Sequence, residues 1–315
     1  MKKVLITGVN GLVGTHLLKK CLNEGYQVVG VDLKKGKQLP SNGWEFIQDD
    51  LTKPFAIEYL FMNHKFDAVF NCFGVKGSPI RAKQKPVDFL YPSFKINTEI
   101  INQCALQNIW LVFVSSVGVY APAEKFVEDD VWKTLPGEAD WFPSWSKRMG
   151  EILLEAYSVQ YNYHNWAIIR PANIFGEYDD FTGNGTVIAS TIKKIVEATD
   201  EIEAWGDGSP IRDFIYAGDV ADGIIKAYEQ RLTQPINLGS GTGVTIKELA
   251  ETLVEIYEEM YGVKVQIEWD PSKPNGDTKR LMSTERAESF GIKQQVSLKE
   301  GLKETIDYYL NEYNK

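Results

Sequence analysis

The first fourteen residues place an apolar strand, a glycine-rich turn and the start of a helix in direct succession. Val4–Ile6 is a short apolar run, three glycines follow it at intervals of three residues, and apolar side chains then recur at helical spacing through Leu22. Such a turn lets backbone N–H groups approach a pyrophosphate, and the helix N-terminus directs partial positive charge at that anion. The segment therefore predicts a dinucleotide site. The residues expected to hold the cofactor there are Gly8, Asn10, Gly11, Leu12, Val13 and Gly14.

A second strand supplies the context that a glycine pattern needs. Residues 27–31 form an apolar run that ends in Asp32, eighteen residues beyond Gly14. An acidic side chain at this point can bind the hydroxyls of the adenosine ribose, and it would repel a 2′-phosphate. The sequence therefore predicts NAD rather than NADP. The alternative is a capped strand end in an α/β protein that binds no phosphate, which the combination of strand, glycines, helix and acid disfavours.

Length and composition describe an ordinary globular chain. Its 315 residues can bury a sizeable core, and 43% are hydrophobic and 24% charged. No apolar run approaches the ~18 residues of a membrane span, and the first apolar stretch ends at Thr7, too early for the core of a signal peptide. We expect a cytoplasmic protein with reduced thiols at Cys21, Cys72 and Cys104, and no metal site. The net charge of −9 argues against a nucleic-acid partner.

Short apolar runs alternate with helical stretches through the first half of the chain. The runs lie at residues 4–6, 27–31, 46–49, 68–71, 110–114 and 166–169, and the longest helical stretches at 86–108 and 144–161. This rhythm predicts an α/β fold with a doubly wound, mostly parallel sheet of the Rossmann type. We expect a dinucleotide-binding domain over 1–170 and a smaller C-terminal substrate-binding lobe over 171–315, of which roughly 213–240 returns to the sheet.

Polar residues follow several of the predicted strands. Ligands of open α/β sheets bind at the carboxyl edge of the strands. Asp50 and Leu51 close the third strand, where they could flank an adenine, although a solvated strand end explains them equally well. Phe73 and Gly74 follow the fourth strand. Lys76 comes two residues later and could touch a cofactor phosphate or sugar hydroxyl, although most lysines are solvated.

Motifs spread over nearly the whole chain resemble those of the extended short-chain dehydrogenase/reductase family. They are Thr7–Gly14, Asp50-Leu51, Ser115-Ser116 with Tyr120, Ser146-Lys147, Arg170–Gly176 and Arg212–Asp219. Within that family the nucleotide-sugar enzymes fit best, and segments 88–101, 204–214 and 273–280 look most like those of GDP-fucose synthases. The resemblance implies that Ser116 and Lys147 are catalytic, that Lys147 also holds the nicotinamide ribose, and that Ser115 and Pro171 lie at the cofactor.

The tyrosine of the family's Ser-Tyr-Lys set is missing. The motif places it four residues before the lysine, on the same helix face, and that position is Pro143. Proline is compatible with the first turn of a helix, so the local structure tolerates the change while the acid/base group is lost. Lys76, Tyr91 or a water held by Ser116 could replace it, and the sequence does not choose among them.

Two further departures narrow the expected reaction. Gly118 and Thr186 match the positions where GDP-fucose synthases carry the cysteine and histidine used for proton exchange, so double epimerisation is disfavoured. Val117 and Gly118 stand where dehydratases carry an Asp-Glu pair, so dehydration is disfavoured too. We expect an NAD-dependent epimerase or oxidoreductase that transfers hydride at a ring carbon, C4, of a GDP-linked sugar. The alternative is a catalytically silent sensor or partner subunit, which Pro143 alone favours.

Basic and aromatic residues of the second half supply the expected substrate contacts. Arg212 and Arg280, next to Lys279, could clamp a diphosphate. Exposed basic side chains are mostly solvated, but both arginines match the diphosphate-binding positions of the resembled family. Trp205 could pack on the sugar or base, and its alternative role is core packing. The resemblance adds Asn173 and Val187 to the substrate site, and it implies a homodimer that pairs through the helices at 86–108 and 144–161.

Overall fold

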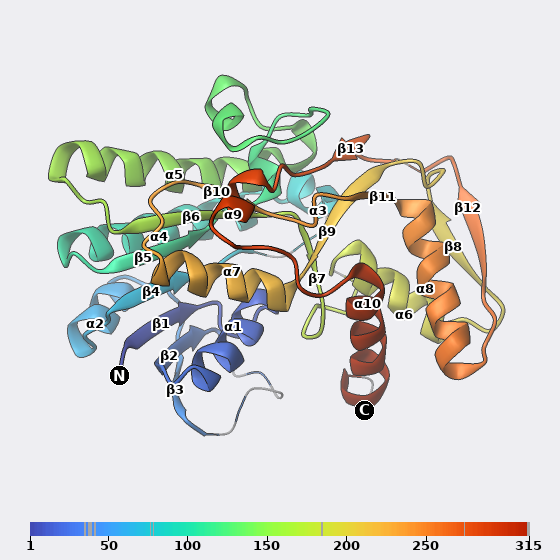
Figure 1. Ribbon diagram of the computed structural model, residues 1–315, viewed down its shortest axis with the longest axis horizontal. Coiled ribbons are helices and arrows are strands. Elements are labelled where there is room, and N and C mark those ends of the chain that lie inside the picture. Colours follow the sequence, from blue (N-terminus) through green and yellow to red (C-terminus); the bar gives the residue numbers. More distant parts are fainter. Residues whose placement is uncertain are drawn as a thin grey trace.

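The computed structural model describes residues 1–34, 36, 40, 42–75, 77, 79–183, 185–273 and 275–313 (Figure 1). In this part of the chain, seven parallel strands form the main sheet. In spatial order they are β10 (Ile236–Leu238), β6 (Trp166–Pro171), β5 (Trp110–Val114), β4 (Ala68–Asn71), β1 (Lys3–Thr7), β2 (Gln27–Asp32) and β3 (Trp44–Gln48). The predicted doubly wound parallel sheet is confirmed.

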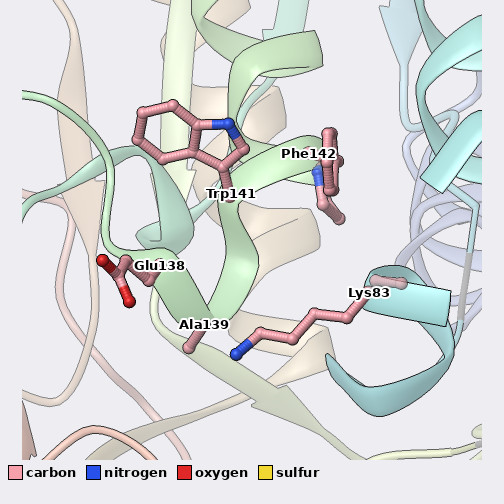
Figure 2. A pocket seen from close by; sticks show the side chains of 7 residues that line it. Lys83, Glu138, Ala139, Trp141 and Phe142 are labelled. Carbon is pink, nitrogen blue, oxygen red and sulfur yellow. The ribbon is translucent and has the colours of Figure 1, made fainter.

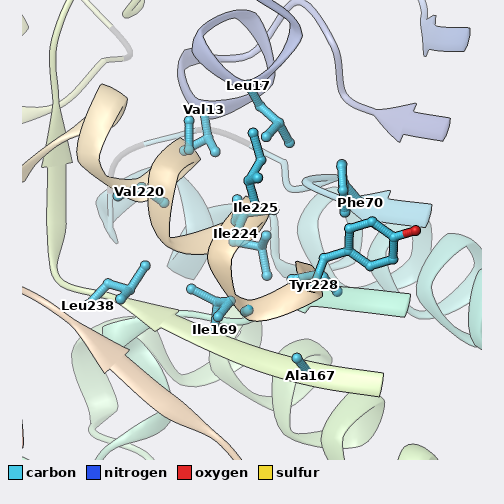
Figure 3. Packing of buried hydrophobic residues seen from close by; sticks show 14 of the residues in the cluster. Val13, Leu17, Phe70, Ala167, Ile169, Val220, Ile224, Ile225, Tyr228 and Leu238 are labelled. Carbon is cyan, nitrogen blue, oxygen red and sulfur yellow. The ribbon is translucent and has the colours of Figure 1, made fainter. Parts of the chain in front are cut away.

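Helices cover both faces of this sheet, which explains why its central strands are apolar throughout rather than alternating. On one face lie α1 (Leu12–Asn23) and α7 (Ala217–Glu229), and on the other α2 (Ala56–Asn63), α4 (Pro86–Leu106) and α5 (Trp141–Tyr161). The short α3 (Pro79–Gln84) precedes α4. Figure 3 shows Leu17 of α1 and Ile224 of α7 packed with Phe70 of β4 in the first of these cores.

A smaller lobe follows in the second half of the chain. One of its sheets has β11 (Gly243–Thr245), β9 (Ile211–Tyr216) and β13 (Lys279–Arg280) in that order, with β7 (Asn173–Phe175) also paired to β9. The other pairs β8 (Glu201–Trp205) with β12 (Gln266–Asp270). Around them lie α6 (Val187–Glu197), α8 (Ile246–Tyr261), α10 (Leu298–Tyr308) and a final π-helical turn (Tyr309–Tyr313), whereas the short α9 (Glu285–Ser289) lies against β10 of the main sheet. In Figure 1 most of this lobe stands to the right of the main sheet.

The chain crosses between the two parts more than once. After β6 it enters the lobe, and α7 and β10 then rejoin the main sheet, where β10 pairs in parallel with β6. Strand β9, which directly precedes α7, belongs to the lobe sheet. The connections between the two parts are short: only Ala172 separates β6 from β7, and β9 runs directly into α7. The lobe strands therefore begin next to the carboxyl end of β6.

The longest surface loop contains three short 3-10 turns, at Val117–Val119, Glu128–Lys133 and Glu138–Asp140, and it leads into α5. This helix begins at Trp141 rather than at the predicted residue 144. Pro143 thus lies in the first turn of α5, where a backbone N–H has no intrahelical partner. The helix therefore accommodates this proline, as expected.

The remaining expectations concern thiols, metals and membranes. Cys21, Cys72 and Cys104 are free, and burial raises the pKa of each thiol, that of Cys72 to about 12. Among the described residues, no cluster of three or more His, Cys, Asp or Glu side chains is arranged to hold a metal ion. None of the helices described here has the length and apolar character needed to cross a bilayer.

Candidate active site

The turn between β1 and α1 leaves no room for a side chain at its first glycine or at the glycine in the first turn of α1. Gly8 has a φ of +66°, a left-handed conformation that favours glycine, and its N–H donates to the Val31 carbonyl at 3.0 Å. A Cβ on Gly14 would lie 2.1 Å from the Gly8 oxygen. Helix α1 starts after Gly11 with no side-chain cap and no acidic residue in its first turn. The first N–H groups of α1 are therefore available to an anion.

Asp32 ends β2 beside this turn and is held in a fixed orientation. One carboxylate oxygen accepts from the Asn10 N–H at 2.9 Å and the other from the Leu33 N–H at 2.8 Å. Burial raises the pKa of Asp32, although both hydrogen bonds oppose that shift. The Asn10 side chain in turn accepts from the Gly36 N–H at 2.9 Å. The glycine cradle, the free helix end and this carboxylate together fit the pyrophosphate and ribose of a dinucleotide.

Asp50 and Leu51 follow β3 at the same edge of the sheet. Asp50 accepts from both the N–H and the hydroxyl of Thr52, at 2.9 and 2.7 Å, and these bonds lower its pKa. Leu51 is buried, with 7% of its surface exposed. The Asp50 carboxylate thus stabilises the turn that follows β3, and Leu51 packs into the core on the α2 and α4 face of the sheet.

Lys147 links two neighbouring strand ends. Its ammonium group donates to the carbonyl oxygens of Phe73 and Val114, both at 2.8 Å, which lie just after β4 and at the end of β5. Burial lowers the pKa of Lys147 to about 8. Gly74 follows at this edge, and a Cβ there would meet no atom within 4 Å. Lys76 lies outside the described residues.

The two serines after β5 have different roles. Ser115 is buried and donates to Glu151 at 2.6 Å, so its hydroxyl is used within the protein. Ser116 accepts from the Gly118 N–H at 3.1 Å and caps the 3-10 turn. Because it remains partly exposed, the Ser116 hydroxyl is available to a ligand at the sheet edge.

The Tyr120 hydroxyl is committed to contacts within the protein. It donates to Asn237 at 2.6 Å and accepts from Arg170 at 3.1 Å. Burial raises its pKa to about 12. Tyr91, which the sequence offered as a replacement, lies on α4 with 58% of its surface exposed.

Pro143 borders a pocket of about 200 Å³ between α3 and the start of α5 (Figure 2). The pocket is lined by Ala82, Lys83, Glu138, Ala139, Trp141, Phe142 and Pro143. Figure 2 shows the amino group of Lys83 reaching toward Ala139. Sequence reasoning missed Lys83, because only the packing of α3 brings it near Pro143.

On the substrate side, the two predicted arginines differ in their surroundings. Arg280 forms an ion pair with Asp140 at 2.7 Å and a second one with Asp277. Burial opposes its charge, but the two carboxylates prevail and raise its pKa. Arg212 donates to the Ile211 carbonyl at 2.8 Å, and burial, followed by the nearby Arg280, lowers its pKa to about 10. Asp140 and Asp277 are functional candidates that the sequence reading did not single out.

The other predicted substrate contacts lie in the lobe or at its border. Asn173 donates to the Asp213 carbonyl at 2.8 Å, which ties β7 to β9. Trp205 is 48% exposed at the end of β8, and Val187 is 41% exposed as the first residue of α6. Pro171 is buried at the end of β6. Lys279 pairs with Glu124 at 2.6 Å.

Fold and site together define a dinucleotide-binding α/β protein with a smaller second lobe. A family model described as "NAD dependent epimerase/dehydratase family" matches residues 4–239. The chain belongs to this family. The expected extended short-chain dehydrogenase/reductase type and the NAD cofactor are thereby confirmed, as is an enzyme of the nucleotide-sugar epimerase/reductase class.

Individual relatives agree with this assignment. The putative GDP-L-fucose synthase 2 of Arabidopsis thaliana is 30% identical over 320 residues, which cover 98% of this chain and 92% of that protein. The GDP-L-colitose synthase of Yersinia pseudotuberculosis is 28% identical, with 99% of each chain covered. A solved UDP-glucose 4-epimerase of Thermus thermophilus in complex with NAD shares the fold with a TM-score of 0.86 at 23% identity, covering 98% of this chain and 99% of that one.

Proposed function

We propose that this protein transfers hydride between NAD and C4 of a GDP-linked sugar. The observation that carries the proposal is the position of Lys147, fixed between Phe73 and Val114 at the strand edge that also bears Asp32 and Ser116. The relatives named as GDP-L-fucose and GDP-L-colitose synthases support a guanosine nucleotide. NAD, when bound, supplies a hydride acceptor or donor, and the protein has to bind the sugar and manage one proton.

The chain's own residues divide this work. With a pKa of about 8, Lys147 is mostly protonated at neutral pH and can donate to cofactor ribose hydroxyls. The Ser116 hydroxyl can hydrogen-bond the reacting sugar oxygen. Arg212 and Arg280 can bind the diphosphate through charge-assisted hydrogen bonds. Epimerisation through a transient ketone and net oxidation or reduction are the two outcomes.

The surroundings of Gly118 and Thr186 support chemistry at a single carbon. Gly118 has no side chain, and the Thr186 hydroxyl donates to Asp179 at 2.6 Å and caps α6 by accepting from the Ala189 N–H. Neither position offers the thiol or imidazole that proton exchange beside a ketone requires.

The test uses the intact protein with NAD and a series of GDP-hexoses, with UDP-glucose as the nucleotide control. We expect at least one GDP-sugar to produce the absorbance of reduced nicotinamide or an epimer detectable by NMR. Lys147→Met should abolish this conversion while GDP binding persists. Conversion of UDP-glucose alone would contradict the proposed nucleotide.

A second candidate function, a sensor that binds NAD and a sugar nucleotide without turnover, is favoured by one observation. The resemblance places Pro143 where the family's tyrosine is expected, and proline offers no proton-transfer group. For this candidate, calorimetry would detect GDP-sugar binding, yet no sugar would change the nicotinamide absorbance.

Assembly and location complete the proposal. Helices α4 and α5 pack together and leave apolar side chains exposed, among them Tyr91 at 58% and Met149 at 43%. This supports a homodimer built on these helices, and light scattering that gives the mass of a monomer would contradict it. Three free cysteines support a reducing compartment, the cytoplasm, which cell fractionation tests.

A further inference from the structure

Gly118 packs closely against three side chains, those of Ser116, Asp140 and Ser144. A Cβ built on Gly118 would stand 3.5 Å from the Ser116 hydroxyl oxygen, 3.3 Å from the Asp140 Cβ and 2.8 Å from the Ser144 hydroxyl oxygen. Ser144 is already committed, because it donates to the Gly118 carbonyl at 2.6 Å. Asp140 is therefore the ionisable side chain among the three that surround Gly118.

Asp140 also lies close in sequence to the position where the family's tyrosine is expected. It directly precedes α5, three residues before Pro143 and seven before Lys147. As the N-cap it has a non-helical backbone, with φ −116° and ψ 27°, so its side chain lies at the end of the helix, about one turn before Pro143. It is the carboxylate nearest in sequence to the point where a tyrosine at this position would meet the substrate.

The third relationship couples Asp140 to the diphosphate site. Its carboxylate pairs with Arg280 at 2.7 Å, and its side chain is 24% exposed. Asp277 forms a second ion pair with the same Arg280 guanidinium. Arg212 lies close enough to Arg280, Asp277 and Asp140 for their charges to act on it. A substrate diphosphate that binds Arg280 has to compete with these two carboxylates.

We propose that Asp140 is the acid/base group that replaces the missing tyrosine, and that diphosphate binding to Arg280 frees it for this role. The inference rests on the proposed function. When the sugar C–H bond breaks, its electron pair leaves as hydride to the nicotinamide, and the hydroxyl proton passes to the Asp140 carboxylate. On reduction the carboxyl returns that proton to the sugar oxygen.

Lys83 is the rival candidate. It is exposed, and its pocket beside Pro143 is bordered by α3 and the start of α5, with neither Ser116 nor Arg280 among the lining residues. The contacts around Gly118 therefore favour Asp140, and Lys83→Met serves as the competing variant.

The first experiment measures proton uptake on nucleotide binding, with GDP as the probe. The charged groups that face Asp140 are Arg280, Arg212 and, through Arg280, Asp277. A diphosphate on Arg280 removes a cation from Asp140 and adds negative charge beside it, which favours a protonated carboxyl. Calorimetry in two buffers of different ionisation enthalpy, at mildly acidic pH, should show proton uptake by the wild-type protein.

Asp140→Asn should lose this uptake while it still binds GDP. Asp277→Asn removes the other carboxylate from Arg280 and should retain the uptake, as should Glu138→Gln in the same short turn. Equal uptake by wild type and Asp140→Asn overturns the proposal. If the wild-type protein binds no GDP at all, the proposed diphosphate site is wrong, and the inference fails with it.

The second experiment measures single-turnover hydride transfer with the GDP-sugar identified above. Asp140→Asn should slow this step by roughly 10²–10⁴-fold with GDP affinity preserved, and Asp140→Glu should recover part of the rate. Asp277→Asn should change sugar-nucleotide affinity rather than the rate of the step. A wild-type rate in Asp140→Asn, or the full loss in Lys83→Met instead, overturns the proposal. Proton uptake without any hydride transfer by the wild-type protein refutes the catalytic role.

Discussion

Arg170 and Glu151 form a two-pronged ion pair in the interior, with only 1% of each side chain exposed. The Arg170 Nε and Nη2 atoms donate to the two oxygens of Glu151 at 3.0 and 2.6 Å. Arg170 also donates to the Glu128 carbonyl, and Glu151 accepts from Ser115. This pair therefore connects β6, α5 and the segment that carries Ser116.

The first prediction concerns loss of one partner of this pair. Arg170→Met leaves the Glu151 carboxylate buried without its cation, so the free energy of unfolding should fall by about 3–5 kcal/mol. Urea unfolding followed by circular dichroism measures it. The control is Lys133→Met, which breaks the exposed pair with Asp130 and should leave stability nearly unchanged. Similar losses in both variants would contradict the prediction.

The second prediction concerns pH. Burial lowers the pKa of Lys147 from 10.5 to about 8, so the folded protein holds this proton less tightly than the unfolded chain does. The free energy of unfolding contributed by Lys147 should therefore rise as the pH increases from about 8 toward 10.5. Urea unfolding of wild type and Lys147→Met across this range gives the difference. A difference that is constant or falls with pH would contradict the lowered pKa.

The third prediction concerns cofactor choice. Asp32 presents its carboxylate where the adenosine ribose is expected, so wild type should bind NAD more tightly than NADP. Asp32→Asn removes the negative charge and should improve the NADP to NAD affinity ratio by roughly tenfold, about 1.4 kcal/mol. Tryptophan fluorescence titration measures both affinities. Asp67→Asn, before β4 at the opposite edge of the sheet, should leave the ratio unchanged.

The fourth prediction concerns the glycine turn. A Cβ on Gly14 would lie 2.1 Å from the Gly8 oxygen and 2.8 Å from the Val9 Cα, so Gly14→Ala must displace the turn. NAD affinity should fall at least a hundredfold, as measured by calorimetry. GDP binding by the Gly14→Ala variant serves as the folding control, because retained binding would show that the lobe residues Arg212 and Arg280 are still in place. NAD binding at the wild-type affinity would show that the cofactor does not depend on this close approach.

Local chemistry made several elements predictable from the sequence. The strand at 68–71 has the predicted bounds because its apolar run is short and clearly delimited. Thr245 and Glu248 form a capping box at the start of α8, and Gly262, with a φ of +71°, ends that helix. Such signals are readable because cap and turn preferences depend on a few neighbouring residues.

Other features depend on contacts between distant segments. Asp140 is unremarkable in the sequence, and its relation to Ser116 and Arg280 arises where α5, the loop after β5 and β13 meet. The sequence interpretation placed Ser115 at the cofactor, whereas its hydroxyl donates to Glu151, thirty-six residues away. The packing of α5 against β5 decides that Ser115, rather than the adjacent Ser116, points into the protein interior.

The sequence by itself determined the glycine turn, the acid at Asp32, the alternation of strands and helices, and the proline, Pro143, four residues before Lys147. Each of these is a property of residue types at short spacing, so no tertiary contact is needed to read it. The tertiary structure decided which charges Arg280 meets, that Tyr120 is committed to Asn237, and that Asp140 and Ser116 both pack around Gly118. These relationships join residues up to 140 positions apart, and only the packing of the sheet against its lobe brings them together.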